Sequence, residues 1–290
     1  MPTGLLMLFT LIGLSGVTRL AKEKGILKMK RVESSFDINK LPIELRKYLR
    51  DVKIYDSSCS IEASTMYLEG KQEMFLKIAP LNSMKKEYEN TKFLNLKSLA
   101  PKVLEYVQHN NRDYLLTERI PGEDGISGGH MDSPKKLAKV FGESLKMLHS
   151  IPIEGCPNKN RTFEIIEEAR MNVSNGGGDL EQLRIDFNLS PSEALEEVEK
   201  LIGCEVDDVI LHGDYCLPNI IMDNFEFTGF IDLGYGGVGD RHWDIYWGIW
   251  TLNFNLGTDE YRDIFLEAYG LDSINNDRLR LCGLLAGLTG

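Results

Sequence analysis

Three short apolar runs, each bounded by polar residues, constrain the fold of this chain more than any other feature. They cover residues 209–211, 219–222 and 227–231. The polar stretch 223–226 between the last two runs has the composition of a turn, so the segment predicts strand, loop, strand, turn and strand. A hairpin centred between Phe225 and Glu226 would place Asn219 opposite Asp232 on an antiparallel neighbour.

Three side chains of this segment suit the transfer of a phosphoryl group from a metal-bound nucleotide to a hydroxyl. Asn219 and Asp232 offer hard oxygen ligands, which Mg²⁺ prefers, and leave room for phosphate oxygens and water. Asp214 lies in the loop before Asn219 and could accept or orient the proton of the acceptor hydroxyl. A lone His-Gly-Asp is a weak signal, because Asp and Asn are common in turns. The combined spacing is what indicates the chemistry.

The segment 211–244 resembles the signature of the aminoglycoside phosphotransferases, antibiotic-resistance kinases with a protein-kinase-like fold. The resemblance is greatest to the 3'-phosphotransferase branch, through Cys216-Leu217-Pro218-Asn219, Gly229-Phe230-Ile231-Asp232 and Gly239-Asp240-Arg241. It implies Asp214 as the catalytic base, Asn219 and Asp232 as Mg²⁺ ligands, and His212 as a structural hydrogen-bonding residue. Protein kinases share the Asp-x4-Asn spacing, but the sequence has no Asp-Phe-Gly or Ala-Pro-Glu motif, which argues against that class.

A lysine inside the apolar run 74–78, Lys77, is the candidate cation for the nucleotide phosphates. The commoner alternative is a strand lysine whose amine extends to water. Helical spacing from Ser83 onward predicts a helix that carries Glu87. The resemblance implies that Lys77 and Glu87 form the lysine–glutamate pair of the family, with Glu89 as the alternative glutamate.

Two other segments are candidates for nucleotide contacts. The predicted hairpin 52–68 contains several serines and no glycine, and the resemblance implies that it covers the phosphates through Ser60. A polar turn without a ligand is the alternative. The segment 114–122 resembles the hinge between two lobes, where the backbone groups of Glu118 and Ile120 would bind adenine.

The acceptor side of the site carries weaker signals. The stretch 172–188 holds Asp179, Glu181 and Asp186, which form either a mobile solvated loop or, as the resemblance implies, the acidic loop that binds aminoglycoside amines. The resemblance also implies that Asp240 and Arg241 support the site and touch the substrate. At the C-terminal end, Ala286-Gly287 follows Leu284-Leu285, where many 3'-phosphotransferases have an Asp-Glu pair, so the acceptor stays open.

Composition limits the classes of protein that this chain can be. Its 290 residues suffice for one large domain or two lobes. Five scattered cysteines without CxxC spacing indicate reduced thiols in a cytosolic compartment and neither a disulfide framework nor a zinc site. The net charge of −11 argues against nucleic-acid binding and suits a cationic ligand such as an aminoglycoside.

The N-terminal segment differs from the rest of the chain. Residues 5–14 are almost wholly apolar and cations follow them, but the run is short for a transmembrane helix and lacks the features of a secretory signal. We expect residues 1–28 to be an extension outside the catalytic fold, which would begin near Met29. A membrane tether that leaves the body on the cytoplasmic side is the alternative.

These observations and the resemblance together predict an α+β, two-lobed protein-kinase-like fold. An antiparallel-sheet N-lobe would cover 29–118 and bind the nucleotide, and a mainly helical C-lobe would cover 119–290. The chain would be a cytoplasmic enzyme, monomeric or homodimeric, that uses ATP or GTP with Mg²⁺ to phosphorylate the 3'-hydroxyl of an aminoglycoside. The alternatives are a kinase for another acceptor, such as a macrolide, choline or a sugar, and a catalytically silent nucleotide-binding protein.

Overall fold

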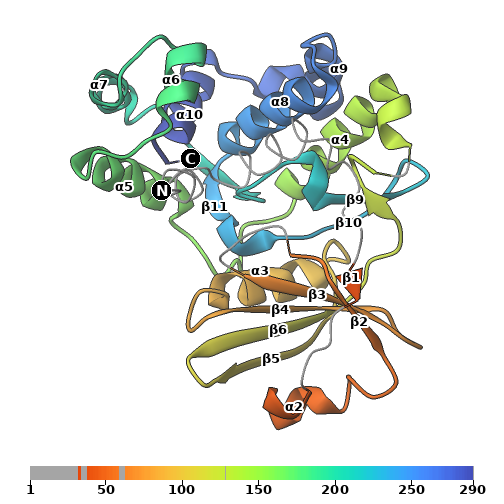
Figure 1. Cartoon of the computed structure of the whole chain (residues 1–290). Helices are drawn as coiled ribbons and strands as arrows, with labels where there is room; N and C mark the ends of the chain where they lie inside the picture. Colours follow the sequence, from red (N-terminus) through yellow and green to blue (C-terminus); the bar gives the residue numbers. More distant parts are fainter. Residues whose placement is uncertain (1–31, 34–37, 59–62, 128, 290) are drawn as a thin grey trace, which may run out of the picture.

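The computed structural model describes residues 32–289 except 34–37, 59–62 and 128. The predicted extension 1–28 and Ser60 therefore lie outside the described residues. The described chain forms two lobes, a sheet-based N-lobe and a mainly helical C-lobe, as predicted (Figure 1). Among the described residues no helix is long and apolar enough to cross a membrane, and the apolar run 5–14 was not among those residues.

The N-lobe is one antiparallel sheet with the strand order β1-β2-β3-β4-β6-β5. Its strands are β1 (Val32–Glu33), β2 (Lys53–Asp56), β3 (Ser64–Glu69), β4 (Met74–Pro80), β5 (Val103–His109) and β6 (Arg112–Glu118). The short elements η1 (Ile38–Lys40) and α2 (Ile43–Arg46) cover one face, where Leu41 and Leu45 pack on apolar residues of β3, β4 and β6. Alternation of buried and half-buried residues along β4 leaves Lys77 on the opposite face from Leu76 and Ile78.

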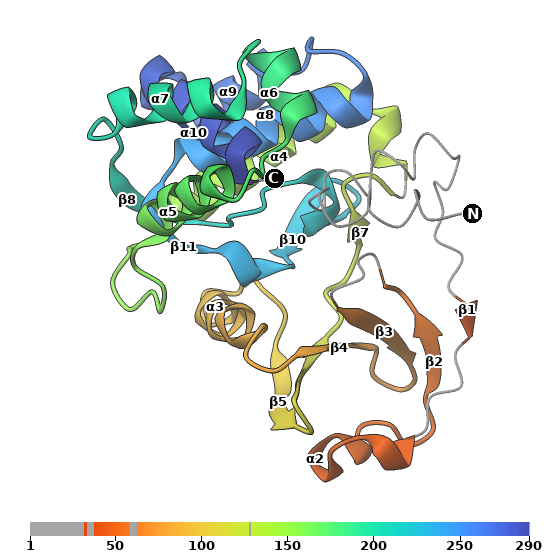
Figure 2. The same cartoon turned by 60° about the vertical axis from the view of Figure 1, so that its left-hand side comes forward.

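Helix α3 (Lys85–Asn95) lies between the N-lobe sheet and the C-lobe, as Figures 1 and 2 show. It begins two residues after Ser83, where the spacing predicts a helix. Thr91 and Leu94 are buried on it, and Met84 is buried just before its first turn. The helix contacts the short η4 turn of the C-lobe (Leu233–Tyr235), so it joins the two lobes beside the predicted metal ligand Asp232.

The C-lobe packs helices around small antiparallel sheets. The helices are α4 (Pro134–His149), α5 (Arg161–Ser174), α6 (Leu180–Asp186), α7 (Pro191–Leu201), α8 (His242–Leu256), α9 (Arg262–Tyr269) and α10 (Asn276–Thr289). The strands are β7 (Glu123–Asp124), β8 (Asp207–Leu211), β9 (Ile220–Asp223), β10 (Glu226–Phe230) and β11 (Gly237–Asp240). Apolar residues of α4, α8 and α9 enclose the inner residues of β8, β9 and β10, which fixes the ends of these strands in space.

Two C-lobe helices begin at a serine–proline pair. Helix α4 begins at Pro134 after Ser133, although the Ser133 side chain makes no capping hydrogen bond. Helix α7 has a capping box, in which the Ser190 hydroxyl accepts from the Glu193 backbone and the Glu193 carboxylate accepts from Ser190.

The stretch 172–188 is not the loop that the sequence indicates. It contains the end of α5, a short glycine-rich connection and the helix α6. The Asp179 carboxylate caps α6 by accepting from the backbone of Glu181 and Gln182, both at 3.0 Å. A loop was expected because the run is short and contains three successive glycines, but the N-cap and packing of α6 against α10 stabilise a helix.

The β9–β10 hairpin forms as predicted, but its register differs by one residue. Phe230 pairs with Ile220, and the Ile231 amide donates to the carbonyl of Asn219 at 3.0 Å. Ile231, and not Asp232, therefore lies opposite Asn219. The turn is centred one residue earlier than expected, and a bulge at Thr228 recovers only one position of the shift.

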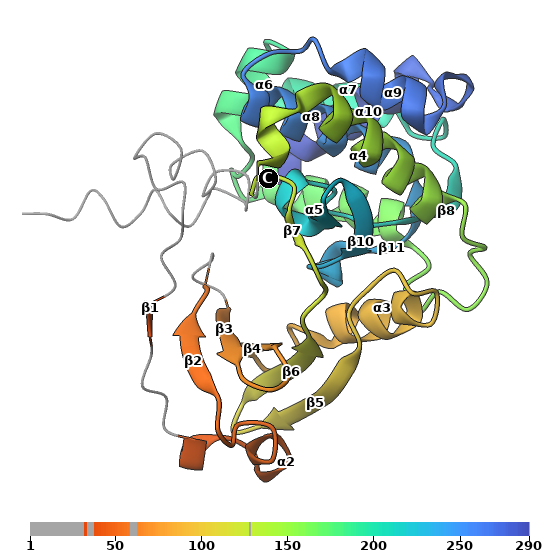
Figure 3. The same cartoon turned by 90° about the vertical axis from the view of Figure 1, so that its right-hand side faces the viewer.

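Residues 119–122 link the two lobes, and Figure 3 shows this link leaving β6 and entering the C-lobe at β7. Gly122 has φ of +108°, and a Cβ there would lie 2.4 Å from the Met222 carbonyl oxygen. Only glycine fits this close approach without strain. The link is thus held against β9, whose N-terminal end follows Asn219.

Candidate active site

Lys77 extends from β4 toward the C-lobe. Its ammonium group contacts the Glu87 carboxylate at 2.6 Å, so the predicted lysine–glutamate pair forms. It also contacts the carboxylate of Asp232 in the other lobe. Burial alone would lower the pKa of Lys77, but the charges of Asp232 and Glu87 outweigh it and raise the pKa, so the amine stays cationic. The alternative glutamate, Glu89, instead faces Lys85 at 3.9 Å.

Asp232 follows β10 in the left-handed conformation, with φ of +59°. Such a conformation is uncommon for residues other than glycine, and here it turns the carboxylate toward Lys77. Burial would raise the pKa of Asp232, but the positive charge of Lys77 outweighs it and lowers the pKa. The carboxylate is therefore ionised at neutral pH and available to a cation.

Asn90 of α3 fixes the turn that follows Asp232. Its amide nitrogen donates to the carbonyl oxygens of Leu233 at 2.8 Å and Gly236 at 3.0 Å, and its oxygen accepts from Asn158 at 2.8 Å. Asn90 is buried and bridges the lobes through these bonds. Asn90 was not among the residues predicted from the sequence. The signal that could have identified it is an asparagine on the apolar face of a predicted helix, where a buried polar side chain requires hydrogen-bond partners.

Asp214 and Asn219 lie on either side of a tight loop after β8. The Asn219 amide nitrogen donates to the backbone oxygen of Asp214 at 2.9 Å and to its Oδ2 at 2.8 Å. The other carboxylate oxygen, Oδ1, accepts from the Cys216 thiol at 3.3 Å. Burial raises the pKa of Asp214, and these hydrogen bonds offset the rise only in part. The loop thus presents a held carboxylate of raised basicity.

The turn before Asp214 is held by the first residues of α8. The buried Asp244 carboxylate accepts from the backbone of His212 at 2.7 Å and of Gly213 at 2.9 Å, and from His149 at 3.1 Å. The Trp243 indole donates to the Gly213 carbonyl at 2.8 Å. His149 and Trp243 are thus structural residues in the C-lobe core. Asp244 fixes this turn, a role that the sequence did not predict.

Gly213 must be glycine in this arrangement. Its φ is +85°, and a Cβ would lie 2.0 Å from the Tyr235 carbonyl oxygen. No L-side chain fits such a distance, so the turn that carries Asp214 approaches the turn after Asp232 as closely as a backbone can. This contact keeps the two carboxylate-bearing turns together.

His212 is completely buried, and its ring packs edge-on against Tyr215 and Phe230. Its Nδ1 accepts from the Asp214 amide at 3.3 Å, which places the ring proton on Nε2. Among the described residues no partner meets Nε2. The geometry agrees with the predicted structural role of His212 and gives it no position from which to act on a substrate.

Asn219 and Asp232 are the side chains here that could hold a metal ion. The Asn219 nitrogen is occupied by Asp214, which leaves its Oδ1 for another partner, and Asp232 has a second carboxylate oxygen besides the one at Lys77. In the described part of the chain no cluster of three or more His, Cys, Asp or Glu could hold a metal. The oxygen-only pair suits Mg²⁺, which takes few protein ligands and completes its shell with phosphate and water.

The predicted substrate residues have diverse surroundings. Asp240 is 1% exposed and binds Arg278 at 2.7 Å and His242 at 2.8 Å, so its side chain lies in the interior and not on a surface that a substrate could reach. Arg241 is half-buried and pairs with Asp208 at 2.8 Å. Asp186 accepts from the Tyr246 hydroxyl at 3.0 Å. The supporting role that the resemblance implies for this segment stays a prediction, but burial argues against a substrate contact by Asp240.

The predicted adenine residues lie at the start of the link. The Glu118 amide donates to the Lys102 carbonyl at 2.9 Å, so that amide is already used within the N-lobe. The Ile120 side chain lies against Gly229 of β10, where a Cβ would meet it at 2.6 Å. The link is thus held on both sides. Of the predicted phosphate loop, Ser58 is described: its backbone amide donates to Asp56 and its hydroxyl accepts from Thr65.

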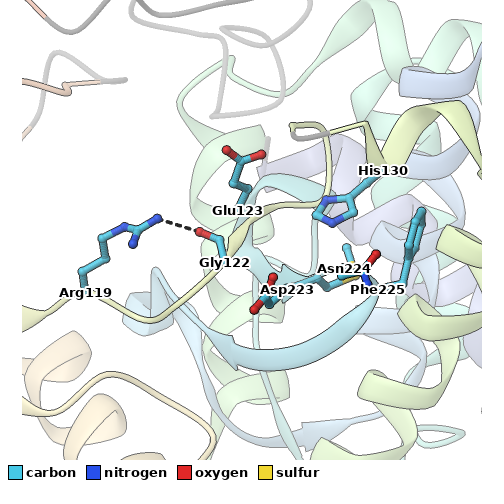
Figure 4. Close-up of a pocket in the computed structure, with 8 residues that line it drawn as sticks. Arg119, Gly122, Glu123, His130, Asp223, Asn224 and Phe225 are labelled. Atoms are coloured by element: carbon cyan, nitrogen blue, oxygen red, sulfur yellow. Dashed lines mark hydrogen bonds between the residues drawn. The ribbon is translucent and has the colours of Figure 1, made fainter.

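A cavity of about 370 Å³ lies at the tip of the β9–β10 hairpin, away from the residues described above (Figure 4). Its walls include Arg119, Gly122, Glu123, His130, Asp223 and Phe225. Arg119 does not project freely into it, because its guanidinium donates to the Gly122 carbonyl at 2.9 Å and pairs with Glu73 at 3.0 Å. The cavity includes neither Lys77 nor Asp214, so it is separate from the candidate active site.

The comparisons with known proteins agree with this geometry. A model of the phosphotransferase enzyme family matches residues 60–284. A probable aminoglycoside 3'-phosphotransferase of Lactococcus lactis subsp. lactis (strain IL1403) is 40% identical over 252 residues, which cover 87% of this chain and 96% of that protein.

Solved structures match as well. The crystal structure of an aminoglycoside 3'-phosphotransferase of type VIII has a TM-score of 0.71 at 25% identity, with 84% of this chain and 96% of that chain covered. An aminoglycoside phosphotransferase of Streptomyces rimosus, solved with ADP and streptomycin, has a TM-score of 0.70 at 23% identity, with coverages of 88% and 100%, and shares the fold. The chain thus belongs to the aminoglycoside phosphotransferase family, with its protein-kinase-like fold, and is a phosphotransferase with an alcohol group as acceptor.

Proposed function

We propose that this enzyme transfers the γ-phosphoryl group of ATP to the 3'-hydroxyl of an aminoglycoside and thereby confers resistance to the antibiotic. The observation that carries the proposal is the contact of Lys77 with Asp232, which joins the cation of one lobe to the carboxylate of the other beside Asp214 and Asn219. The 40% identity to the Lactococcus protein, whose name includes the 3'-hydroxyl, supports the choice of acceptor.

On the nucleotide side, Lys77 would bind the phosphates, and Glu87 would hold its ammonium group in place. Backbone groups near Glu118 and Ile120 would receive the base of ATP or GTP, and Ser60 would lie over the phosphates. Asn219 and Asp232 would hold Mg²⁺. When bound, that ion would neutralise charge on the phosphate oxygens. Lys77 would then exchange its contact with Asp232 for contacts with phosphate.

On the acceptor side, Asp214 would accept or orient the proton of the attacking hydroxyl. Its carboxylate is held at both oxygens by Asn219 and Cys216, so its orientation is set before substrate binds. Phosphoryl transfer needs little covalent help from the protein, and most of the rate would come from positioning and charge neutralisation during direct in-line attack. The reaction requires ATP, which agrees with a cytoplasmic enzyme.

The amines of the acceptor would be bound by the acidic residues of the α6 segment, and Arg241 would lie near the substrate without binding its amines. Glu181 is exposed, whereas Asp179 uses one oxygen as a helix cap. Another acceptor class, such as a macrolide, choline or a sugar, is the second candidate. It is favoured by Ala286 and Gly287, which are buried against α6 where many relatives have acids.

The two acceptors kanamycin B and tobramycin separate these proposals, because they differ only in the 3'-hydroxyl. Purified enzyme with Mg²⁺ and ATP should release ADP with kanamycin B and not with tobramycin, and ³¹P NMR should place the new ester at the 3' position. ATP consumption with a macrolide or choline, but with neither kanamycin nor neomycin, would overturn the aminoglycoside assignment. ATP and GTP are compared in the same assay.

A resistance measurement tests the same proposal in cells. Cells that express the chain from Met29 should survive higher kanamycin concentrations than cells that carry an empty vector. Cells that express the Asp214→Asn variant at equal abundance serve as the control and should be as sensitive as the empty-vector cells. Equal resistance of the variant and the parent would contradict the role of Asp214.

A further inference from the structure

Cys216 lies two residues after Asp214 and contacts its carboxylate. The thiol sulfur is 3.3 Å from Oδ1, while the Asn219 amide nitrogen is 2.8 Å from Oδ2. Each oxygen of the carboxylate is thus met by a different donor. The asparagine belongs to the metal-ligand pair, whereas the cysteine has no part in the proposed reaction apart from this contact.

The direction of the hydrogen bond follows from the chemistry of the two groups. A thiol has a hydrogen to donate, whereas an ionised carboxylate has only acceptor oxygens. Cys216 donates, and Asp214 Oδ1 accepts.

The position of the thiol is itself fixed by the backbone on both sides. The Cys216 amide donates to the Asp214 carbonyl at 2.9 Å, and the next amide, that of Leu217, donates to the Thr251 hydroxyl of α8 at 3.3 Å. The side chain also packs against the apolar cluster that contains Trp243 and Trp247. Because the thiol is fixed in this way, its hydrogen bond can in turn fix the orientation of the Asp214 carboxylate.

We propose that Cys216 is a positioning residue for Asp214, whose thiol fixes the plane of the carboxylate toward the acceptor hydroxyl. The inference rests on the proposed function, in which Asp214 handles the hydroxyl proton. The terminal torsion of an aspartate is broad, so a single donor at Oδ2 would leave the plane free to turn. A second donor at Oδ1 restricts it, and the remaining lone pair of Oδ1 is left for the hydroxyl.

Variants at position 216 distinguish positioning from simple filling of space. Cys216→Ala removes the donor, Cys216→Val removes it without leaving a cavity, and Cys216→Ser keeps a donor. With ATP, Mg²⁺ and kanamycin, Ala and Val should lower kcat about tenfold, the effect of losing one hydrogen bond to a charged group. Both KM values should stay within about twofold, because substrate binding is untouched, and Ser should restore most of kcat.

Cys156→Ala is the matched control. Its thiol also donates at 3.4 Å, but to the Asn158 carbonyl and not to a carboxylate that takes part in the reaction, so kcat should not change. Thermal unfolding of every variant is measured beside the kinetics. If Cys216→Ala does not fold, the comparison of Val with Ser decides. Parental kcat in Val or Ala, or a loss in Ser equal to that in Val, would overturn the inference.

A double variant separates this inference from the proposed function. In an Asp214→Asn background the carboxylate is gone, so Cys216→Ala should no longer reduce the residual kcat, and the two effects should not add. Additive losses would show that Cys216 acts elsewhere. An Asp214→Asn enzyme with parental activity would reject the role of Asp214 in the proposed function, on which this inference rests. An inactive Asp214→Asn enzyme beside a fully active Cys216→Ala enzyme would reject only the role of Cys216.

Discussion

The turn that carries Asp214 and the segment that carries Asp179, Glu181 and Asp186 both present carboxylates, yet they are built differently. The turn is held by the buried Asp244 and by a backbone approach that only Gly213 permits. The α6 segment lies at the surface, where Asp179 caps a short helix and Glu181 faces solvent. In the proposed function, reaction chemistry depends on a few fixed groups, whereas amine recognition depends on exposed charges.

The largest effect is expected in the turn itself. Asp214→Asn keeps the shape of the side chain but removes the group that accepts the proton, so kcat should fall about 10²–10⁴-fold. The KM values for ATP and kanamycin should change little. The control is Asp223→Asn, an exposed carboxylate at the end of β9, which should retain parental kcat. A similar kcat in both variants would mean that Asp214 matters no more to the reaction than an exposed carboxylate does.

Asp244, which holds this turn, should matter as much for the stability of the protein as Asp214 does for the reaction rate. Asp244→Ala leaves the buried amides of His212 and Gly213 and the His149 ring without their acceptor. Loss of one partner from such a buried network should lower the free energy of unfolding by about 3–5 kcal/mol. Urea denaturation measures it, with the exposed Asp272→Ala as the control. A fall of less than 1 kcal/mol in the free energy of unfolding would mean that Asp244 does not stabilise the turn.

Asp240, the last residue of β11, should make the free energy of unfolding depend on pH. Burial works against ionisation of Asp240, but hydrogen bonds from His242 and Arg278 lower its pKa to about 2. Because the folded pKa lies below the unfolded value of about 3.9, the stabilisation is present above pH 4 and is lost as the pH falls through about 2. The contribution is about 2–3 kcal/mol.

The measurement is the unfolding free energy of the parent and of Asp240→Asn between pH 2 and pH 7. The decline toward low pH should be smaller in the variant by the amount given above. Asp208→Asn, which removes a partly exposed partner of Arg241, is the control and should keep the parental pH dependence. Parallel curves for Asp240→Asn and the parent would contradict the assignment.

The turn that carries Asp214 and the hairpin beside it could be predicted from sequence because their signals are local. Asp214 follows β8, Asn219 directly precedes β9 and Asp232 follows β10, and strand and turn composition located all three. The register of the hairpin could not be predicted, because the turn forms one residue earlier than its composition indicates and the bulge at Thr228 returns only one position of the shift. The Thr228 hydroxyl lies 2.7 Å from the Pro121 carbonyl of the link between lobes. A pattern of strands and turns carries no information about such a contact.

The α6 segment was harder to predict for a related reason. Helix α6 is short, and three glycines precede it, so local propensity favours a loop. The helix is stabilised by distant partners, since Leu183 packs against Gly287 of α10 and Gln182 donates to the Tyr246 hydroxyl of α8 at 2.7 Å. Asn90 was missed for the same reason, because its partners lie more than 60 residues away in the chain.

A smaller effect is expected where α6 begins. Asp179→Ala removes the cap of α6 and should lower the free energy of unfolding by about 1 kcal/mol. Asp179→Asn keeps an equally good cap and removes only the charge, so its stability should match the parent. The KM for kanamycin in the Asn variant then reports the charge alone. If Asn destabilises the protein as much as Ala does, the side chain does more than cap the helix.

The smallest effect is expected at Glu181. Replacing this exposed carboxylate by glutamine removes one attraction for an amine of the acceptor, and such exposed pairs are worth about 0.2–1 kcal/mol. The KM for kanamycin should therefore rise about 1.5–5-fold while kcat and the KM for ATP stay constant, and added salt should reduce the difference. Glu196→Gln, on α7, is the charge-matched control. A fall in kcat would mean that the α6 segment contributes to the reacting geometry, and the two regions would then not be separable.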